Sequence, residues 1–510
     1  MSHAKGPARP AFAPRSKLYK GRFGRICPGL TPWVPPGVPP EQIEAHFVAF
    51  ANEHMTERPG MSPGEAIEID DELEAEFSSG IPAGYTYFGQ FVDHDITFDP
   101  TPLGVELTDP EGLDNFRTPR LDLDCVYGSG PHDQPYMYEL TEDPNDPSRK
   151  VPNSERFLIG SIEGQPLADL PRNPNGRAII GDMRNDENAI VSQIQLAFLT
   201  AHNALVDRAI AAGKANPFME ARRVLTWLYQ HCVWEDFVRR ICIDEVVDTA
   251  LQKDKGKDGR VQWQLGLKDV YNWEYNPFMP LEFSVAAYRF GHSMVRNGYQ
   301  TNFTHNQLER VALFNNTTSG PGADEPDLRG FGPRKPVTTV QWDWFFDMGN
   351  EADFFPQMAR KIDTKLANAL LFLGEDDGDP ASVANKLAAR NLIRGVMMEL
   401  PSGPDVAAKL NVPVTVNLSE EEPAALWYYI LKEAEGQGGA RLGRLGSTIV
   451  CAVFAGLLKG DPKAYVNVDP GWSPEKELAS GMLTDGDKQD NPDWGLQAIL
   501  RISGQPVSGV

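Results

Sequence analysis

Residues 84–101 read GYTYFGQFVDHDITFDPT, and this stretch says most about the fold and the functional site. Gln90 and His94 stand four positions apart, so a helix would place both side chains on one face. Asp93 and Asp95 flank the histidine, and most other residues are aromatic or aliphatic. A histidine between acids is usually a surface residue with a raised pKa, whereas apolar surroundings favour a functional site. Both interpretations stay open on this stretch alone.

A second motif, RTPRLDLDCVYGSG at residues 117–130, is rich in hard oxygen donors. Thr118, Asp122 and Asp124 are spaced by two or four positions, so an extended chain would point them in one direction. A hydroxyl, two carboxylates and an intervening carbonyl suit Ca²⁺, which binds six to eight oxygens. The alternative is a solvated loop whose acids cap local turns.

The third motif, GDMRNDENAIVSQIQLAFLTAHNALVDR at residues 181–208, predicts the start of a helix. Asp182 or Asn185 can cap this helix, and the acids that follow suit its positive N-terminus. Capping does not explain Arg184, a cation at the end of the helix where the dipole disfavours one. We therefore consider Arg184 and Glu187 as a pair that faces a cleft.

The fourth motif, LEFSVAAYRFGHSMVRNGYQ at residues 281–300, has apolar residues three and four positions apart. This spacing puts His292 on the apolar face of a helix. Such a histidine is often structural, as we expect for His202. The alternative is axial ligation of a haem iron, which needs a neutral imidazole in an apolar wall.

The fifth motif, ARNLIRGVMMELPSG at residues 389–403, places Asn391 and Arg394 three positions apart on one helix face. Asn391 could accept a hydrogen bond from a ligating imidazole, and Arg394 could pair with a carboxylate. Taken alone, both are ordinary residues of a helix surface.

Composition excludes several classes of protein. The 510 residues are 41% hydrophobic and 23% charged, which is typical of a soluble globular protein and not of a fibrous or disordered one. The net charge of −23 would repel phosphate backbones and anionic lipid, so we expect no nucleic-acid partner. Five cysteines without a C-x-x-C pair predict buried thiols in a reducing compartment, not disulfides or a zinc cluster.

Helical periodicity recurs along the chain, and alternating strand patterns are rare. The predicted fold is mainly α, a single large helical domain over residues 41–510 with long loops and little β, after an N-terminal arm and loop over residues 1–40. Residues 337–342 are the best strand candidate. Helices are expected at residues 40–55, 187–212, 217–241, 282–297, 352–373, 382–398, 420–435 and 445–458.

No targeting or membrane segment stands out. The first 25 residues are basic but lack the apolar core of a secretory signal. The cleanest apolar run, at residues 445–458, is shorter than the roughly 20 residues that span a bilayer, so it predicts a buried core helix and no transmembrane segment. We expect a cytoplasmic protein, with export by a route that needs no cleaved signal left open.

The stretches GQFVDHD, TPRLDLDCVYGS, GDMRNDEN and YRFGH occur together and in this order. In this combination the chain resembles the animal-type haem peroxidases of the peroxidase–cyclooxygenase superfamily, and more narrowly their bacterial members. The resemblance implies a helical haem-peroxidase domain with buried haem b.

The resemblance also implies roles for single residues. His94 corresponds to the distal histidine, Arg184 to the distal arginine, and Gln90 to the pocket glutamine that helps hold water or halide. His292 corresponds to the proximal iron ligand, and Asn391 to its hydrogen-bond partner.

Further correspondences concern the haem edge and a calcium ion. Arg289 and Arg394 match arginines near the haem and its propionates. Asp93 and Glu187 match the carboxylates that form ester bonds to the haem in mammalian members, and the sequence leaves such bonds open. The residue after Glu187 is Asn188 rather than methionine, so no sulfonium link is expected. The calcium loop is matched by Asp95, Thr118, the carbonyl of Arg120, Asp122 and Asp124.

The expected function is a haem peroxidase that reduces hydrogen peroxide and oxidises small organic donors or halides. Its cofactors would be haem b and Ca²⁺, and its partners hydrogen peroxide and a small-molecule reductant. The first alternative is a haem-dependent fatty-acid dioxygenase, whose radical tyrosine typically stands three residues before the proximal histidine. Here that position is Arg289, with Tyr288 four before His292, which favours the peroxidase. A non-catalytic haem or adhesion protein is the second alternative.

Overall fold

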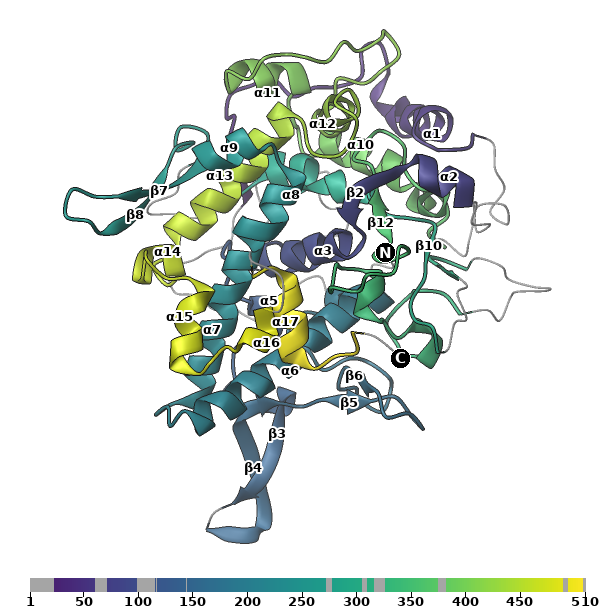
Figure 1. Cartoon of the computed structure of the whole chain (residues 1–510). Coiled ribbons are helices and arrows are strands. Elements are labelled where there is room, and N and C mark those ends of the chain that lie inside the picture. The colour runs from purple at the N-terminus through teal and green to yellow at the C-terminus, as the bar shows by residue number, and fades with distance from the viewer. Residues whose placement is uncertain are drawn as a thin grey trace.

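The computed structural model has a helical body built around one long central helix (Figure 1). Helix α6 (Ala189–Ala211) is buried along most of its length, as expected of a helix that is apolar on all sides. Helices α3 (Gly84–Ile96), α7 (Pro217–His231) and α17 (Leu496–Ser503) pack against it. The structure describes residues 23–59, 71–98, 115, 117–143, 145–271, 278–304, 310–315, 326–374, 382–488 and 494–507.

The other helices of the described ranges surround this centre. In the first half they are η1 (Pro40–Gln42), α1 (Ile43–His54), α2 (Asp71–Glu76), α5 (Asp124–Tyr127), η4 (Pro135–Met137), η5 (Met183–Asp186), η6 (Cys232–Val238), α8 (Arg239–Ile241) and α9 (Asp244–Ala250). In the second half they are η7 (Glu282–Ala286), η8 (Ala287–His292), η9 (Pro336–Thr338), η10 (Trp342–Trp344), η11 (Asn368–Leu371), η13 (Val383–Asn385), α10 (Leu387–Met397), α11 (Gly403–Lys409), α12 (Leu426–Glu435), α13 (Arg444–Gly460), α14 (Tyr465–Val468), α15 (Pro474–Ser480) and α16 (Asp485–Lys488).

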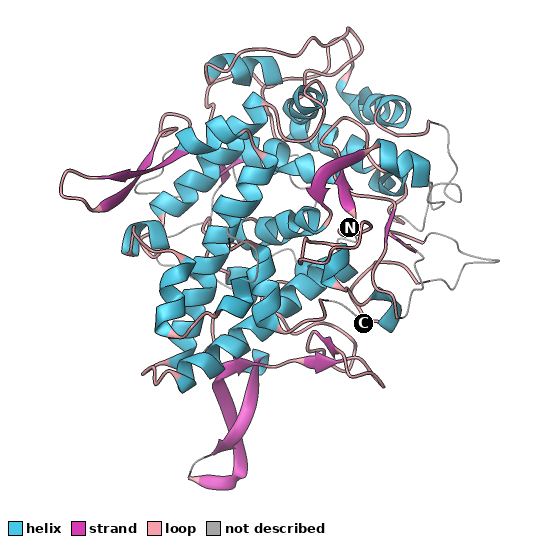
Figure 2. Ribbon diagram, viewed as in Figure 1, coloured by secondary structure: helices cyan, strands magenta, loops and turns pink. Residues whose placement is uncertain are grey.

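Strands are few and pair only two by two within the described residues. Two hairpins, β3–β4 and β7–β8, project from the helical body (Figure 2). The prediction of a mainly α fold with little β is therefore confirmed. The pairs are β1 (Phe23–Gly24) with β9 (Met279–Pro280), β2 (Ser78–Pro82) with β12 (Met358–Arg360), β3 (Tyr138–Asp143) with β4 (Asp146–Phe157), β5 (Gly160–Ser161) with β6 (Ala168–Asp169), β7 (Leu251–Lys255) with β8 (Val261–Leu265), and β10 (Gly298–Tyr299) with β11 (Val311–Ala312).

Several predicted helices are confirmed. Residues 40–55 contain α1, residues 187–212 contain α6, and residues 217–241 form a nearly continuous helix of α7, η6 and α8. The apolar run at residues 445–458 lies in α13, which is buried as a core helix. The division into an arm and one domain stays a prediction, and residues 1–22 of the arm lie outside the described residues.

Two predicted elements are wrong. Residues 352–373 form no long helix: Met358–Arg360 is strand β12, and the buried Arg360 pairs with Glu57. This strand pairing and ion pair override a helical periodicity that Pro356 already weakens. Residues 337–342 are not a strand, because the Gln193 side chain of α6 binds their backbone groups, accepting from the N–H of Val340 at 2.7 Å.

The helix expected at residues 282–297 also differs in type. Segment η7 is a π-helix and η8 a 3₁₀-helix, and the chain leaves the helical conformation soon after His292. The break falls at Ala286, whose backbone is not helical (φ −125°, ψ −74°). The buried carboxylate of Glu282 accepts the N–H groups of Ile26 and Cys27, which fixes the start of this segment against the N-terminal strand β1. Such helix irregularities are frequent at functional sites.

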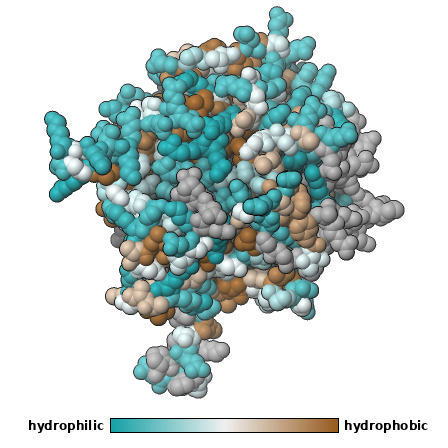
Figure 3. Space-filling model, in the orientation of Figure 1, coloured by the Kyte–Doolittle hydropathy of each residue, from teal (hydrophilic) through white to brown (hydrophobic). Residues whose placement is uncertain are grey.

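Only α6, among the helices of the described ranges, is long and apolar enough to cross a membrane. Because 89% of its apolar window is buried inside the protein, it is a core helix here. All five cysteines are buried free thiols, as predicted. The face of the molecule in Figure 3 is mostly hydrophilic with small separate hydrophobic areas, in keeping with the acidic composition.

Candidate functional site

Helix α3 carries the first predicted site residues. It begins where the backbone of Gly84 approaches Phe346 so closely that a Cβ would lie 2.2 Å from that ring. Two aromatic residues of α3 pack against the neighbouring helices: Phe91 stacks on Phe198 of α6 with ring centroids 4.6 Å apart, and Phe88 contacts Tyr229 of α7. This packing fixes the face that bears Gln90 and His94, which lie on one helix as predicted.

His94 is buried, with 4% of its surface exposed, and one of its ring nitrogens has a hydrogen-bond partner. Its Nδ1 lies 2.7 Å from Oδ1 of Asn185, and its Nε2 lies 3.9 Å from Oε1 of Glu187. Burial and the nearby guanidinium of Arg184 lower the pKa of His94 to about 3, so the imidazole is neutral at physiological pH. A neutral imidazole can accept a proton from a bound substrate.

Glu187 and Gln90 lie directly beside this histidine. The side-chain amide of Gln90 donates to Oε1 of Glu187 and accepts from Nδ2 of Asn188 at 2.9 Å. Burial raises the pKa of Glu187 to about 7, although Arg184 opposes the shift. The structure therefore brings Gln90, His94 and Glu187 together, as predicted, and adds Asn188.

Arg184 is anchored to the C-terminal end of α3. Its Nη2 donates to the carbonyl of His94 at 3.0 Å and to that of Thr97 at 2.5 Å. Asp182 accepts from the same guanidinium and caps the short segment η5, not the long helix for which it was predicted as a cap. Although burial disfavours its charge, Arg117 and Arg184 keep the pKa of Asp182 far below its usual range. Arg184 is thus a fixed cation next to the neutral histidine.

The capping role predicted for Asn185 is wrong. Helix α6 is capped by Asn188, whose Oδ1 accepts from the N–H groups of Ile190 and Val191. Asn185 instead turns its side chain inward to His94. Neither Asn185 nor Asn188 was assigned a site role from sequence, because the acids around them gave no sign of which side chain points inward.

The second half of the site is the η8 segment. His292 ends η8, and its Nδ1 lies 2.8 Å from Nδ2 of Asn391 on α10. Burial and the nearby Arg289 lower the pKa of His292 to about 3, so this imidazole is also neutral. Tyr288 donates to the carbonyl of Gly89 at 3.2 Å, which joins η8 directly to α3.

The amide of Asn391 is turned differently from the prediction. Its oxygen accepts from Nη1 of Arg289 at 3.1 Å, so its nitrogen, rather than its oxygen, faces His292. Arg394 lies one turn further along α10 and is partly exposed.

Asp93 lies between the two halves. Its Oδ1 accepts from the hydroxyl of Thr97 at 3.0 Å. Burial raises the pKa of Asp93, and Arg184 from one half and Arg289 from the other oppose this shift. The carboxylate is therefore within electrostatic reach of both arginines.

The predicted calcium residues gather around a loop that is turned rather than extended, contrary to the sequence prediction. Leu123 has a left-handed backbone (φ 56°), and Asp124 begins the short helix α5. Thr118 donates to the carboxylate of Asp122 at 3.0 Å. Asp95 accepts from the N–H of Leu123 at 3.2 Å, so the loop is bound to α3.

The acids of this loop lie close to one another. Burial and Asp124 raise the pKa of Asp95 to about 7, and burial with Asp124 and Asp95 raises that of Asp122 well above its usual range. The side chain of Arg120 turns away to donate to Asp461 at 3.3 Å. In the described ranges, no group of three or more His, Cys, Asp or Glu side chains has the arrangement of a metal site.

His202 is a structural histidine, as predicted. It is fully buried, and its ring nitrogens lie 3.0 Å from the hydroxyl of Tyr127 and 2.9 Å from the carbonyl of Glu155. Both nitrogens therefore have protein partners, in contrast to Nε2 of His94.

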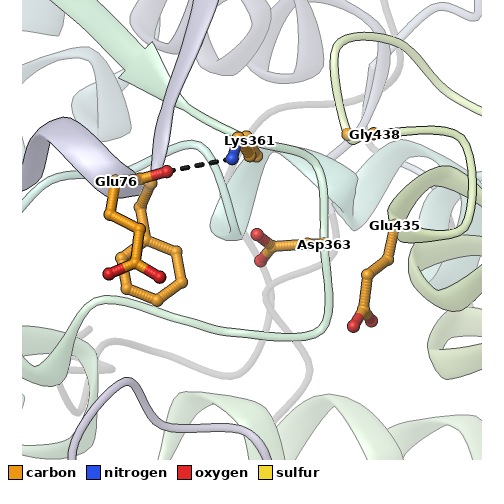
Figure 4. Close-up of a pocket in the computed structure, with 7 residues that line it drawn as sticks. Glu76, Lys361, Asp363, Glu435 and Gly438 are labelled. Carbon is orange, nitrogen blue, oxygen red and sulfur yellow. Dashed lines mark hydrogen bonds between the residues drawn. The ribbon is translucent and has the colours of Figure 1, made fainter. Parts of the chain in front are cut away.

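A cavity of about 180 Å³ lies apart from the predicted site residues. Asp363 and Glu435 are among the residues that line it, and Nζ of Lys361 donates to the carbonyl of Glu76 at 2.9 Å (Figure 4). Burial raises the pKa of Asp363 to about 6. The lining residues are Glu76, Phe77, Lys361, Asp363, Glu435, Gly438 and Gly439.

Comparison with known sequences gives one family. A sequence model of the family described as animal haem peroxidase matches residues 104–325. Chorion peroxidase of Drosophila melanogaster is 27% identical over 319 residues, which cover 58% of this chain and 35% of that protein. A peroxidase-like protein of Margaritifera margaritifera is 31% identical over 144 residues, or 26% of this chain and 17% of that protein. The chain spans about a third or less of the length of these relatives.

Comparison with solved structures shows the fold. Peroxidase A from Dictyostelium discoideum has a TM-score of 0.55 at 13% identity, covering 94% of each chain. Fatty acid alpha-dioxygenase from Oryza sativa has a TM-score of 0.57 at 15% identity, covering 95% of this chain and 86% of that one. The family model covers less than half of this chain, and the solved structures, at 13% and 15% identity, show a shared fold. The expectation of a bacterial member stays a prediction.

Proposed function

We propose that this chain is a haem peroxidase that reduces hydrogen peroxide and oxidises small organic donors or halides. The observation that carries the proposal is the neutral, buried His94 beside the fixed cation Arg184, on a helix bonded directly to the segment of His292. The sequence match to peroxidases favours the same activity.

The residues of the site fit a haem. His292 offers a neutral imidazole, the form that ligates iron. A Cβ at neighbouring Gly291, or at Gly395 next to Arg394, would meet no atom within 4 Å, which is consistent with room beside this histidine. Ligation through Nε2 requires the proton on Nδ1, so the amide of Asn391 must then present its oxygen to the ring. The haem, when bound, would take up the two oxidising equivalents of hydrogen peroxide and pass them on to a donor.

The chain's own side chains would manage protons and charge. Nε2 of His94 takes a proton from hydrogen peroxide and returns it to the departing oxygen, so that water leaves. Arg184 provides a positive charge where negative charge develops, and it needs no movement because three acceptors hold it. Gln90 orients water or halide beside Glu187.

The proposal also includes two carboxylates at the haem edge and a calcium site. Asp93 and Glu187 would lie at the haem edge, within reach of Arg184 and Arg289, as hydrogen-bonded carboxylates or as ester links. Ca²⁺ would bind Asp95, Thr118, Asp122, Asp124 and the carbonyl of Arg120, where the mutual repulsion of the acids favours a bound cation. Binding would require these side chains to converge further than they do here.

A second candidate function is a fatty-acid dioxygenase, favoured by the fold shared with alpha-dioxygenases. Tyr288 is the nearest tyrosine to His292 in sequence, and it is buried with its ring stacked on Phe283 at 4.8 Å. Oxygen uptake with an unsaturated fatty acid, without turnover of peroxide, would favour this candidate.

The test of the main proposal is haem binding followed by rapid mixing with peroxide. We expect a Soret band that His292→Ala abolishes and a fast spectral change on addition of hydrogen peroxide. His132→Ala, a change at an exposed histidine, serves as the matched control and should leave both unchanged. Full haem retention with an unchanged spectrum in His292→Ala would contradict the assignment of the ligand. Tight retention of haem in acidic butanone would support the ester links.

A further inference from the structure

Asn185 lies directly behind the imidazole of His94, on the side away from Nε2. Its Oδ1 is 2.7 Å from Nδ1 of His94, and its Nδ2 donates to Oε1 of Gln195 on α6 at 2.8 Å. Asn185 and Gln195 are both fully buried, so bulk solvent does not compete for these groups. Gln195, Asn185 and His94 are thus linked by hydrogen bonds in a row that runs from helix α6 to the imidazole.

The donor and acceptor roles in these two hydrogen bonds determine which nitrogen of the imidazole carries the hydrogen. An amide side chain donates only through nitrogen and accepts only through oxygen. Because the nitrogen of Asn185 donates to Gln195, its oxygen faces His94 and can only accept. Nδ1 must then carry the hydrogen, and Nε2 of the neutral ring keeps its lone pair.

In the second asparagine–histidine pair, Asn391 and His292, the amide is turned the other way. Asn391 presents its nitrogen to Nδ1 of His292, because Arg289 donates to its oxygen. In both pairs the outcome depends on a third residue, an acceptor behind Asn185 and a donor behind Asn391. At His94 the direction of the Asn185 amide goes together with Gln195, which presents its Oε1 to Asn185 in this structure.

We propose that Asn185, held by Gln195, is a positioning residue that fixes His94 in its Nδ1–H tautomer and leaves Nε2 as the proton acceptor of the site. The inference rests on the proposed peroxidase function, in which Nε2 takes the first proton of hydrogen peroxide. A neutral amide suits this role, since a carboxylate there would add a negative charge next to Asp182 and Glu187. Arg117 and Arg184 are the positive groups that face the same ring.

The direct test is the tautomer itself. In the full chain labelled with ¹⁵N-histidine, imidazole nitrogen shifts distinguish the two neutral forms, and the spectrum of His94→Ala identifies the signals of His94. We expect a protonated Nδ1 in the unmodified chain, with and without haem in a diamagnetic state. A protonated Nε2 would overturn the inference, and this measurement needs no variant at position 185.

Variants of Asn185 and Gln195 then test whether the tautomer of His94 affects the rate of the peroxide reaction. Asn185→Leu and Gln195→Met should each weaken the preference for Nδ1–H and slow the peroxide reaction, about 10–100-fold for the first. Asn185→Asp should restore the tautomer, because a carboxylate only accepts, and should move the acidic limb of the rate profile to higher pH. An unchanged tautomer and rate in Asn185→Leu would contradict the inference.

The two proposals fail in different ways. If the chain binds no haem or does not react with peroxide, the proposed function is wrong, and the nitrogen shifts still decide the tautomer. If His94→Ala slows the peroxide reaction but Asn185→Leu does not, the function stands and the positioning role is wrong.

Discussion

At the scale of single residues, the proposed reaction assigns proton transfer to His94 and charge stabilisation to Arg184. Burial keeps His94 neutral, and the backbone carbonyls of its own helix hold Arg184 in place. The cation also lies 4.6 Å from the ring of Phe98, which covers one side of the guanidinium. Neither residue needs to move for the proposed reaction.

Replacing His94 should separate cofactor binding from chemistry. In His94→Ala we expect haem to stay bound, while the reaction with hydrogen peroxide slows by about 10²–10⁴, the usual contribution of acid–base catalysis. Stopped-flow spectra in the Soret region measure the rate. A normal rate in this variant would refute the proposed role of His94.

Glu187 should make stability depend on pH. Its pKa is about 7 in the folded protein against an ordinary value of 4.5, so between these values the folded state binds more protons than the unfolded state. Its contribution to the free energy of unfolding is therefore full at low pH and is lost as pH rises through the folded value. Urea unfolding of the chain and of Glu187→Gln at about pH 5 and about pH 8 should show a smaller loss in the variant, in which Asp95 and Asp363, whose pKa values are also raised, still contribute.

At the scale of elements, α3 connects both halves of the site to the acidic loop. Its middle contributes the carbonyl of Gly89, which accepts from Tyr288 of η8, and its C-terminal end contributes Asp95, which accepts from the N–H groups of Leu123 and Cys125. The tight turn at Leu123 aims these N–H groups at the carboxylate. A change in the loop can thus reach His94 through its neighbour Asp95.

Removing calcium should loosen this helix. If Ca²⁺ binds the loop, treatment with a chelator should lower the melting temperature and slow the peroxide reaction, because Asp95 loses the cation that offsets its repulsion with Asp124. Readdition of Ca²⁺ should restore both, and Asp122→Asn should abolish the response. A melting temperature that is insensitive to chelator and to Ca²⁺ would count against the site.

The bond between Tyr288 and Gly89 should matter for stability rather than for peroxide chemistry. Tyr288→Phe removes one buried hydrogen bond, so we expect a loss of about 1 kcal/mol in the free energy of unfolding. The peroxide reaction should persist in this variant. Loss of the oxidation reaction with intact haem would instead favour the dioxygenase, in which a tyrosine carries the radical.

At the scale of the whole molecule, the long buried helices could be predicted from sequence and the local bonding could not. The apolar periodicity of α6 and α13 identifies them, and Gln90 and His94 share a face because of their spacing. The role of Asn185 depends on partners 91 and 10 positions away, which no local pattern encodes. Arg360 likewise turns a helical pattern into a strand through a partner 303 positions away.

Burial of the five thiols also has a consequence for their reactivity with oxidants. None of the five cysteines has more than 2% of its surface exposed, and burial raises the pKa of Cys27 to about 12, so the reactive thiolate form is scarce. An aromatic disulfide reagent should label no cysteine in the native chain and all five in urea. Rapid labelling without denaturant would contradict this. In the proposed peroxidase this burial would shield the sulfur atoms from hydrogen peroxide, and we expect the protein to tolerate purification and storage without thiol reductants.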